Sequence, residues 1–292
     1  MRIVFFLACW KRPEITELCF MGLNRLMEYD PKRFQCSAFA VISEPEMVPL
    51  CKRYGIDYLE YENKPVGMKK NAGLQEVLKK DFDYLIELGS DDLILNELLD
   101  CYEPAMKEGR DFIGSRDLLM IDSIDGNCRT LNFDGETAQG LGRCLSKRLL
   151  QCFTGNVHVK AHTNIIDDDS VINPGETGFL DIKTVKAYEP MGWCERTGKD
   201  VTVHLWDDIN QGLDNNSAGR IMRKGFKFHA VETPEPLMAD VKGDDNIWGF
   251  NPEIGEKVDV QTFLSKLSQK ERSKFFENMK VLKAKRVECA QA

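Results

Sequence analysis

The chain has 292 residues, of which 42% are hydrophobic and 29% are charged, a composition typical of a globular protein that buries a full core. Its 47 acidic residues outnumber its 39 basic residues and give a net charge of −8, which argues against broad attraction to nucleic acid or to an anionic membrane. The ten cysteines are scattered without a Cys-x-x-Cys pair, so they predict neither a disulfide framework nor a zinc knuckle.

The first hundred residues alternate between predicted strands and helices. Apolar patterning predicts strands over 3–8, 34–42 and 58–61 and helices over 15–27 and 46–54. Such alternation implies an α/β protein with a mainly parallel sheet and helices on both of its faces. No Gly-x-Gly-x-x-Gly follows the first strand, so a dinucleotide-binding site has no support.

The apolar run at the N-terminus is interpreted as the first buried strand. It is short for a signal peptide, and no small-residue cleavage site follows it. No stretch approaches the roughly 20 apolar residues of a membrane span. From these features and the scattered cysteines we expect a cytoplasmic protein with no membrane span.

Residues 66–98 join a short basic segment to an acidic pair through one helix and one apolar strand. The helix begins with the polar residues Lys69, Lys70 and Asn71, and the strand over 84–88 ends at Gly89-Ser90-Asp91-Asp92. An acidic pair at the mouth of a buried strand is costly unless solvent, a hydrogen bond or a cation compensates it. In open α/β sheets the carboxyl ends of strands are also where ligands bind. Lysines suit phosphate oxygens, and aspartates suit a hard metal ion.

This segment resembles the nucleotide-sugar-binding half of GT-A glycosyltransferases, particularly the large family 2. That family carries a Gly-x-x-x-(Arg/Lys)-Asn-x-Gly-Leu helix, an apolar strand and then Asp-x-Asp-Asp. The sequence departs from the pattern at Gly89, where the first acid of the motif is expected. The resemblance implies a GT-A fold, a nucleoside-diphosphate sugar donor, and Mn²⁺ or Mg²⁺ bound by Asp91 beside Asp92. The alternative is that both aspartates only cap a helix beginning near residue 93.

After residue 104 the regular alternation stops. Short strands are predicted over 111–115, 118–122 and 129–133, with a hairpin turn at 125–127. A Gly-rich stretch over 140–146 and a predicted helix over 147–152 resemble one wall of the acceptor side in family 2 enzymes. Residues 153–212 fit no clear template apart from a helix over 180–188 and a strand over 201–205. We expect an insertion there that shapes the acceptor pocket or an oligomer contact.

A late helix supplies the candidate catalytic base. Residues 212–228 resemble the family's late x-Glu-Asp helix, and the acid falls on Asp214. Asp214 would remove the proton of the acceptor hydroxyl if the reaction inverts configuration. Asp207 and Asp208, which follow Trp206, are the competing choice, and an N-capping role for Asp214 is the structural alternative.

Two further segments complete the predicted donor site. Trp10 and Arg12 follow the first strand, where the family's nucleobase and ribose pocket begins. Asp240 and Lys242 lie in the position of the segment that closes over the diphosphate in GT-A enzymes, where a third metal ligand is often found. Asp240 and His229 are the candidates for that ligand.

The sequence is therefore interpreted as a GT-A-like domain over 1–257 followed by a C-terminal helical tail over 258–292. The nucleotide-sugar half spans 1–104 and the acceptor half spans 105–257, with a mixed, mainly parallel sheet flanked by helices. The expected activity is metal-dependent transfer of a sugar to a hydroxyl acceptor on a glycan, a lipid-linked molecule, a protein or a modified nucleic acid. The chain could also form a homo-oligomer.

Two other functions stay open. One is a non-catalytic GT-A-like protein that binds a nucleotide sugar or acts in assembly, because Gly89 replaces a motif acid. The other is a nucleotidyltransferase that makes the activated sugar. That class would show a Gly-rich, Arg-containing signature after the first strand, where this chain has Cys-Trp-Lys-Arg-Pro over 9–13.

Overall fold

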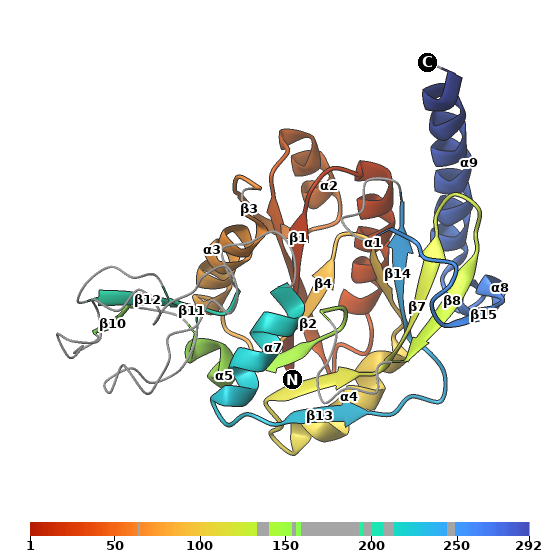
Figure 1. Ribbon diagram of the computed structural model, residues 1–292. Coiled ribbons are helices and arrows are strands. Elements are labelled where there is room, and N and C mark those ends of the chain that lie inside the picture. Colours follow the sequence, from red (N-terminus) through yellow and green to blue (C-terminus); the bar gives the residue numbers. More distant parts are fainter. Residues whose placement is uncertain are drawn as a thin grey trace.

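The computed structural model describes residues 1–63, 65–132, 140–153, 156–158, 193–194, 200–206, 213–243 and 249–291. A seven-stranded sheet lies at the centre of these segments, with helices on both of its faces (Figure 1). Its strands follow the order β13-β6-β9-β4-β1-β2-β3. They are β1 (Arg2–Cys9), β2 (Gln35–Ile42), β3 (Asp57–Glu60), β4 (Tyr84–Gly89), β6 (Phe112–Ser115), β9 (Cys144–Ser146) and β13 (Phe228–Val231).

The pairing within this sheet is mixed but mainly parallel. β1 pairs in parallel with β2 and with β4, and β2 pairs in parallel with β3. β13 and β6 are parallel too, whereas β9 runs antiparallel to both β4 and β6. The α/β class and the mixed, mainly parallel sheet predicted from the sequence are confirmed.

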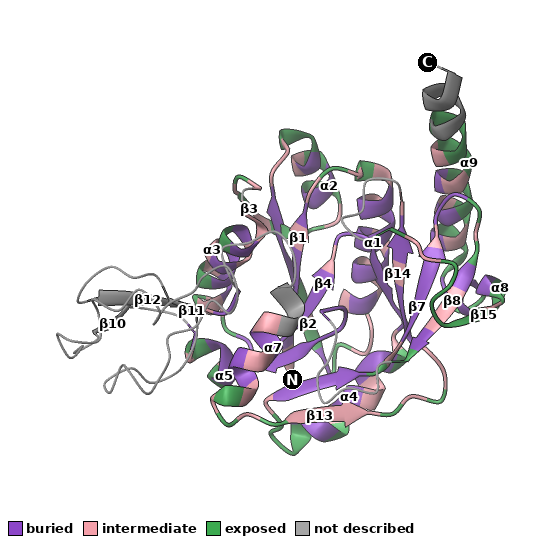
Figure 2. Cartoon of the chain, viewed as in Figure 1, coloured by how far each residue is buried: buried purple, intermediate pink, exposed green. Residues whose placement is uncertain are grey.

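Strand β1 shows why helices cover both faces of the sheet. Successive side chains of a strand point to opposite faces, and in β1 both sets are apolar: Phe5 and Leu7 belong to one core, Val4 and Phe6 to another. The first core includes side chains from α1 (Pro13–Met27), α2 (Val48–Arg53) and α4 (Glu97–Lys107), and the second from α3 (Val66–Leu78), α5 (Lys147–Gln151) and α7 (Leu213–Arg223). A strand buried on both faces reads as a continuous apolar run, and the sheet is buried throughout its centre (Figure 2).

A second sheet, of order β15-β8-β7-β14-β5, lies beside the first core. It consists of β5 (Asp92–Ile94), β7 (Asp117–Asp122), β8 (Cys128–Asn132), β14 (Met238–Lys242) and β15 (Glu256–Val258). β7 and β8 form the antiparallel hairpin that the turn at 125–127 predicted.

The capping role considered for Asp91 and Asp92 is wrong. Residues 92–94 form strand β5, which pairs antiparallel with β14. The next helix, α4, begins only at Glu97 and has Asn96 at its N-cap. The backbone of the short apolar run after the two aspartates therefore pairs with another strand, and the aspartates do not lie at the start of a helix.

Most of 153–212, including the predicted helix over 180–188, lies outside the described residues. The parts described form a three-stranded sheet of order β10-β12-β11, with β10 (Asn156–His158), β11 (Trp193–Cys194) and β12 (Asp200–His204). β12 agrees with the strand predicted over 201–205.

The tail contains two helices, α8 (Val260–Leu264) and α9 (Gln269–Gln291). α9 packs against α1, and its far end extends beyond the body of the protein (Figure 1). The side-chain amide of Asn278 donates to the carbonyl oxygen of Glu14 at 2.8 Å, and Lys274 forms an ion pair with Glu17 at 2.8 Å. None of the helices in the described part of the chain combines the length and apolar composition that a membrane crossing needs.

The packing of α3 on the sheet generates a stability prediction at Gly73. A Cβ added there would lie 2.2 Å from Val41 Cγ2 and 2.9 Å from Phe6 Cε2, so Gly73→Ala should destabilise the fold by about 1–3 kcal/mol through overpacking. Gly22 in α1 is the matched control, because its nearest neighbour would lie at 3.5 Å. Gly22→Ala should stabilise the helix by roughly 0.5–1 kcal/mol. The free energy of unfolding of both variants is measured by denaturant titration. Equal changes in the two variants would contradict the packing argument.

Candidate functional site

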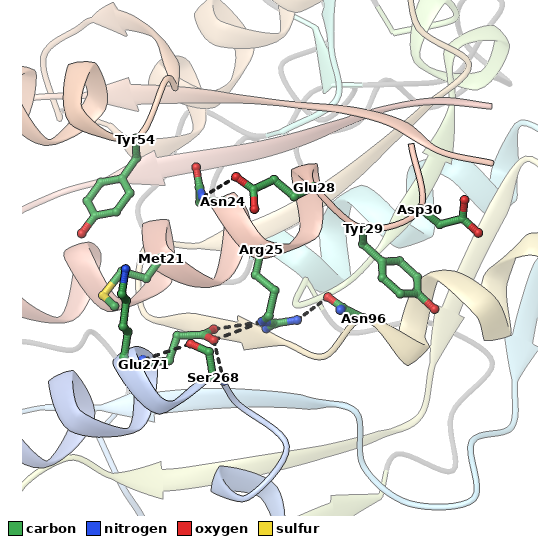
Figure 3. Close-up of a pocket in the computed structure, with 11 residues that line it drawn as sticks. Met21, Asn24, Arg25, Glu28, Tyr29, Asp30, Tyr54, Asn96, Ser268 and Glu271 are labelled. Carbon is green, nitrogen blue, oxygen red and sulfur yellow. Dashed lines mark hydrogen bonds and ion pairs between the residues drawn. The ribbon is translucent and has the colours of Figure 1, made fainter. Parts of the chain in front are cut away.

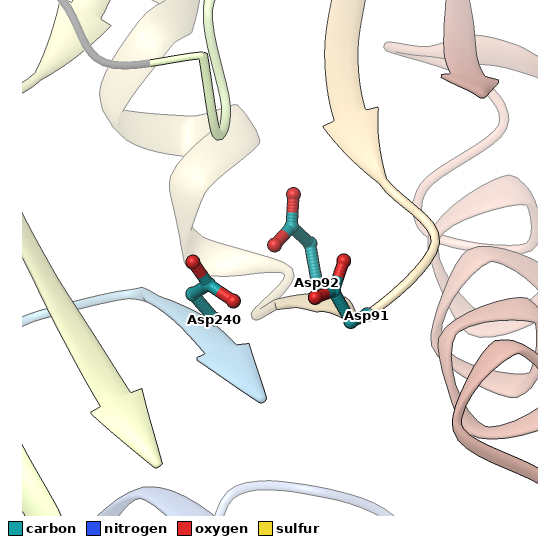
Figure 4. A group of neighbouring side chains, drawn as sticks. All are labelled: Asp91, Asp92 and Asp240. Atoms are coloured by element: carbon teal, nitrogen blue, oxygen red, sulfur yellow. The ribbon is translucent and has the colours of Figure 1, made fainter. Parts of the chain in front are cut away.

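Three carboxylates meet at the carboxyl end of β4. Asp91 lies between β4 and β5, Asp92 begins β5, and Asp240 lies directly opposite Asp92 in the antiparallel β5–β14 pair. One oxygen from each of the three side chains lies within 4.8 Å of the others (Figure 4). Asp91 and Asp92 are buried and Asp240 is half-buried. The three aspartates predicted from the sequence as metal ligands are thus brought together, although 148 residues separate the last two.

Two cations already contact this group. Arg12 Nη1 lies 2.8 Å from Asp91 Oδ2, and Arg12 Nη2 donates to Ser90 Oγ at 3.3 Å. Lys242 Nζ lies 2.5 Å from Asp240 Oδ2. The backbone N–H of Gly89 donates to Asp92 Oδ2. Among the described residues, the group thus combines three acidic side chains with two cations in a largely buried site.

Burial is the main cause of the raised pKa values of two of these carboxyl groups, and neighbouring charges add to it. Burial raises the pKa of Asp92 well above its usual range, and the charges of Asp240 and Asp91 raise it further. Burial and then the charge of Asp91 raise the pKa of Asp240 to about 7, although Lys242 acts in the opposite direction. Lys242 itself has a raised pKa, because the charges of Asp240 and Asp91 outweigh the lowering by burial.

The residues present fit a hard divalent cation. Asp240 Oδ1 is buried and accepts no hydrogen bond within the described segments. An all-oxygen donor set of carboxylates suits Mg²⁺ or Mn²⁺. Such an ion would add positive charge beside these carboxylates and give Asp240 Oδ1 a partner.

The backbone that delivers Arg12 to the site is strained. Lys11 and Arg12 have φ angles of 55° and 52°, a left-handed conformation that is uncommon for residues other than glycine. α1 starts at Pro13, directly after them, and no side chain caps its N-terminus. Lys11 Nζ lies 4.5 Å from the centre of the half-buried Trp10 ring. Strained backbone of this kind is concentrated at functional sites, and nothing in the sequence signals it.

Lys69 has a structural role in place of the phosphate contact predicted from the sequence. Its side chain is fully buried. The ammonium donates to the carbonyl oxygen of Cys9, to Ser43 Oγ at 2.6 Å and to Asn63 Oδ1 at 3.1 Å. These acceptors follow or end β1, β2 and β3, so all three ammonium protons connect the carboxyl ends of neighbouring strands. Burial lowers the pKa of Lys69 to about 8.

Lys70 and Asn71 also make contacts within the protein. Lys70 Nζ lies 2.5 Å from Glu87 Oε1 and 5.3 Å from the centre of the Trp206 ring. Asn71 Nδ2 donates to the carbonyl oxygen of Trp206 at 2.8 Å, and Asn71 Oδ1 accepts from its backbone N–H at 3.2 Å. Asn71 therefore holds the backbone of residue 206 through two hydrogen bonds.

A buried ionic cluster around Glu87 went unnoticed in the sequence. Glu87 lies in the middle of β4, and Arg143 Nη1 is 3.7 Å from its Oε2. Arg143 also donates to Ser217 Oγ of α7 at 2.6 Å, and Arg220 of α7 donates to the carbonyl oxygen of Leu205 at 3.0 Å. A glutamate inside an otherwise apolar strand is the signal that could have revealed this cluster, because a buried charge needs a partner.

The structure places the other predicted residues as follows. Asp214 lies in the first turn of α7, as predicted, but its side chain is outside the described part of the chain. Asp207 and Asp208 lie outside the described residues. His229 lies in β13 at the edge of the central sheet and does not belong to the acidic group.

A separate cavity of about 570 Å³ lies between the carboxyl-terminal half of α1, residue 96 and the start of α9 (Figure 3). Arg25 lies in it and makes contacts with two distant segments. Its Nη2 donates to the carbonyl oxygen of Ile94 in β5 at 2.7 Å, and its Nε donates to Glu271 Oε1 at 3.1 Å. Arg25 therefore connects the strand that begins with Asp92 to the helical tail.

No protein-family model and no curated protein matches the sequence. Among solved structures, the chain is similar to S. aureus TarS 1–349 in complex with UDP-GlcNAc, with 10% identity, a TM-score of 0.48, and coverage of 96% of this chain and 71% of that one. It is similar to the mannosyltransferase PcManGT from Pyrobaculum calidifontis in complex with GDP-Man and Mn²⁺, with 9% identity, a TM-score of 0.46 and 84% coverage, spanning 58% of that protein.

It is also similar to a cytidylyltransferase from Leptospira borgpetersenii serovar Hardjo-bovis, with 12% identity, a TM-score of 0.44, and coverage of 98% and 94% of the two chains. What the structure itself shows is a mixed, mainly parallel sheet flanked by helices.

The raised pKa values generate a prediction about pH and metal. At about pH 8 Asp240 is ionised, whereas at about pH 5.5 protons compete for the carboxylates, so Mn²⁺ should raise the melting temperature more at the higher pH. Without metal, the stability of the protein should change with pH in the opposite direction. The raised pKa of about 7 contributes stability that is complete below the unfolded value near 3.8 and is lost as the pH rises through about 7.

Thermal unfolding with and without Mn²⁺ at both pH values tests this prediction. Asp240→Asn serves as the control, since it removes the titrating carboxyl group and should reduce the pH dependence of the metal effect. An identical Mn²⁺ effect at the two pH values in the unsubstituted protein would contradict it.

Proposed function

We propose that the protein is a metal-dependent glycosyltransferase that moves a sugar from a nucleoside-diphosphate sugar to a hydroxyl acceptor. The observation that carries the proposal is the convergence of the carboxylates of Asp91, Asp92 and Asp240, together with the buried Oδ1 of Asp240, which accepts no hydrogen bond from the described residues. The group follows β4, the position at which the resemblance to family 2 expects the metal-binding acids. It also lies at the carboxyl end of a parallel strand, where ligands of α/β proteins bind.

Each residue has a stated task in this proposal. Asp91, Asp92 and Asp240 would hold Mn²⁺ or Mg²⁺. The bound ion would supply positive charge for the leaving diphosphate. Arg12 and Lys242 add two positive charges beside the same carboxylates. Trp10, which follows β1, would border the nucleobase and ribose.

Asp214 would act as the general base on the acceptor side. Its carboxylate would take the proton of the acceptor hydroxyl while that oxygen bonds to the anomeric carbon. The bond between the anomeric carbon and the phosphate oxygen would break in the same displacement, with inversion of configuration. Ser217 and Arg220, on the same helix, anchor α7 to residues 143 and 205, which would hold the base in a fixed place.

One observation favours a non-catalytic binding protein as the second candidate. A Cβ at residue 89 would lie 2.7 Å from Asp91 Oδ1 and 3.1 Å from Asp92 Oδ2. The acid that family 2 has at this position therefore does not fit beside the two aspartates as they are arranged. A donor contact expected from the family is replaced by close packing, so binding without transfer is the rival outcome.

Asp91→Asn tests the metal site. In the variant, the affinity for Mn²⁺ should fall by roughly 100-fold or more, because even the loss of an outer-sphere partner costs about 10–100-fold in metal affinity. Mn²⁺ should then no longer increase the affinity for a nucleoside diphosphate. Asp83→Asn is the matched control: Asp83 precedes the same strand β4 and also pairs with an arginine, Arg2. Isothermal titration of both variants with and without Mn²⁺ gives the answer. Metal dependence that survives in Asp91→Asn would exclude this site.

Asp214→Asn separates enzyme from binding protein. Asp214 lies in the first turn of α7, so its replacement by Asn should cost no more than a helix-dipole interaction of about 0.3–1 kcal/mol. Donor affinity should hardly change, whereas transfer should fall by roughly 10²–10⁴-fold. Transfer and donor affinity are measured on the same preparation. Full transfer in the variant would remove the base role and turn attention to Asp207 and Asp208. Donor binding by the unsubstituted protein without transfer to any acceptor would favour the second candidate.

A further inference from the structure

The two cations beside the acidic group are attached in different ways. Lys242 lies two residues from Asp240 on the same strand, and its buried ammonium contacts Oδ2 of that side chain. It leaves Asp240 Oδ1 without a hydrogen bond in the described part of the structure. Arg12 comes from another element, the end of β1, and occupies an oxygen of Asp91. Asp91 is the residue that the proposed function makes the principal metal ligand.

Arg12 is held in place by few contacts. Its guanidinium has the ion pair to Asp91 and a longer hydrogen bond to Ser90 at 3.3 Å, while its Nε is buried and makes no hydrogen bond to the residues described. The side chain remains 15% exposed, so it lies at the mouth of the site. The backbone of Arg12 has a φ angle of 52°, in the left-handed region that residues other than glycine rarely adopt.

A metal ion and the guanidinium of Arg12 would compete for the carboxylate of Asp91. The guanidinium already contacts Oδ2 of Asp91, and a second positive charge brought to the same buried carboxylate would be repelled by the guanidinium. Arginine is weakly hydrated, and its planar fork matches two phosphate oxygens as well as a carboxylate. The same side chain therefore has a second partner available when a diphosphate is near.

We propose that Arg12 and the divalent metal ion exchange on Asp91. Without metal, the guanidinium neutralises Asp91; with metal, it leaves that oxygen and takes the phosphate oxygens of the donor. This inference rests on the proposed function, since it needs a metal at Asp91 and a diphosphate donor beside it.

The exchange makes metal binding and donor binding depend on each other. Metal alone has to displace Arg12, which weakens its binding, whereas metal with a diphosphate gives the displaced guanidinium a new partner. By linkage, the donor strengthens metal binding by the same factor by which the metal strengthens donor binding. A merely structural Arg12 would have no such effect: its loss would weaken both ligands together.

The experiment compares the unsubstituted protein with Arg12→Gln. Mn²⁺ alone is titrated by following the electron paramagnetic resonance of the free ion, and UDP, GDP, ADP and CDP are titrated on the Mn²⁺-loaded protein. Arg12→Gln should bind Mn²⁺ alone about tenfold more tightly or better, and it should bind the tightest nucleoside diphosphate about tenfold more weakly, the scale of one hydrogen bond to a charged group.

Arg33→Gln is the matched control for net charge. Arg33 forms ion pairs with Asp100 and Glu103, and its carbonyl oxygen accepts from the N-terminus, at the other end of β1 and thus on the order of 25 Å from Arg12. This variant should bind both ligands as the unsubstituted protein does. Equal tightening of Mn²⁺ binding in Arg33→Gln and Arg12→Gln would overturn the exchange.

A second measurement needs no substitution. In crystals of the unsubstituted protein grown with and without Mn²⁺, the guanidinium should lie on Asp91 only when the ion is absent. Unchanged or weaker Mn²⁺ binding by Arg12→Gln, or a guanidinium still on Asp91 beside a bound ion, overturns the inference. Asp91→Asn distinguishes a failure of the proposed metal site from a failure of the exchange. If this variant binds Mn²⁺ as tightly as the unsubstituted protein, the metal site of the proposed function is wrong. Loss of Mn²⁺ binding in that variant with no gain in Arg12→Gln refutes the exchange alone.

Discussion

Repulsion among three carboxylates in a largely buried place is the constraint around which the site is organised. Asp91, Asp92 and Asp240 are brought within 4.8 Å of one another by the pairing of β5 with β14, and burial alone would leave them strongly unfavourable as anions. The fold compensates with Arg12, Lys242 and a backbone N–H. Burial raises the pKa values of Asp92 and Asp240, and the convergence of carboxylate oxygens makes the group suitable for a cation.

The central sheet could be predicted because its physical signal is local. β1, β2 and β4 are largely buried, so they read as apolar runs between helical segments, and their alternation with helices predicts a mainly parallel sheet. Asp91 could be predicted for the same reason, since an acid directly after such a strand must find compensation. Asp240 depended on the resemblance to a family, because the pairing of β5 with β14 joins segments far apart in the chain and leaves no local pattern.

What the sequence could not reveal were the directions of long polar side chains. Lys69 and Lys70 are adjacent lysines, and the charge pattern is equally consistent with two phosphate ligands; in the structure one joins three strand ends and the other neutralises Glu87. Arg12 was expected near the nucleobase and instead contacts Asp91. These outcomes depend on which buried acceptor each cation can reach, and that is decided only once the tertiary contacts exist.

The contacts of Arg25 have a consequence for the order in which the protein is made. Its guanidinium supports the carbonyl oxygen of Ile94, two residues after Asp92, and is itself neutralised by Glu271, which lies 246 residues further along the chain. Domains generally begin to fold from the N-terminal side during synthesis. The nascent chain can therefore form β4 early, whereas β5, which begins with Asp92, has to wait for its partner β14 at residues 238–242. The counter-charge of Arg25 arrives later still, once the ribosome has translated past residue 271. Until then a cation beside that strand lacks its carboxylate, so the acidic site acquires its final support only late in translation.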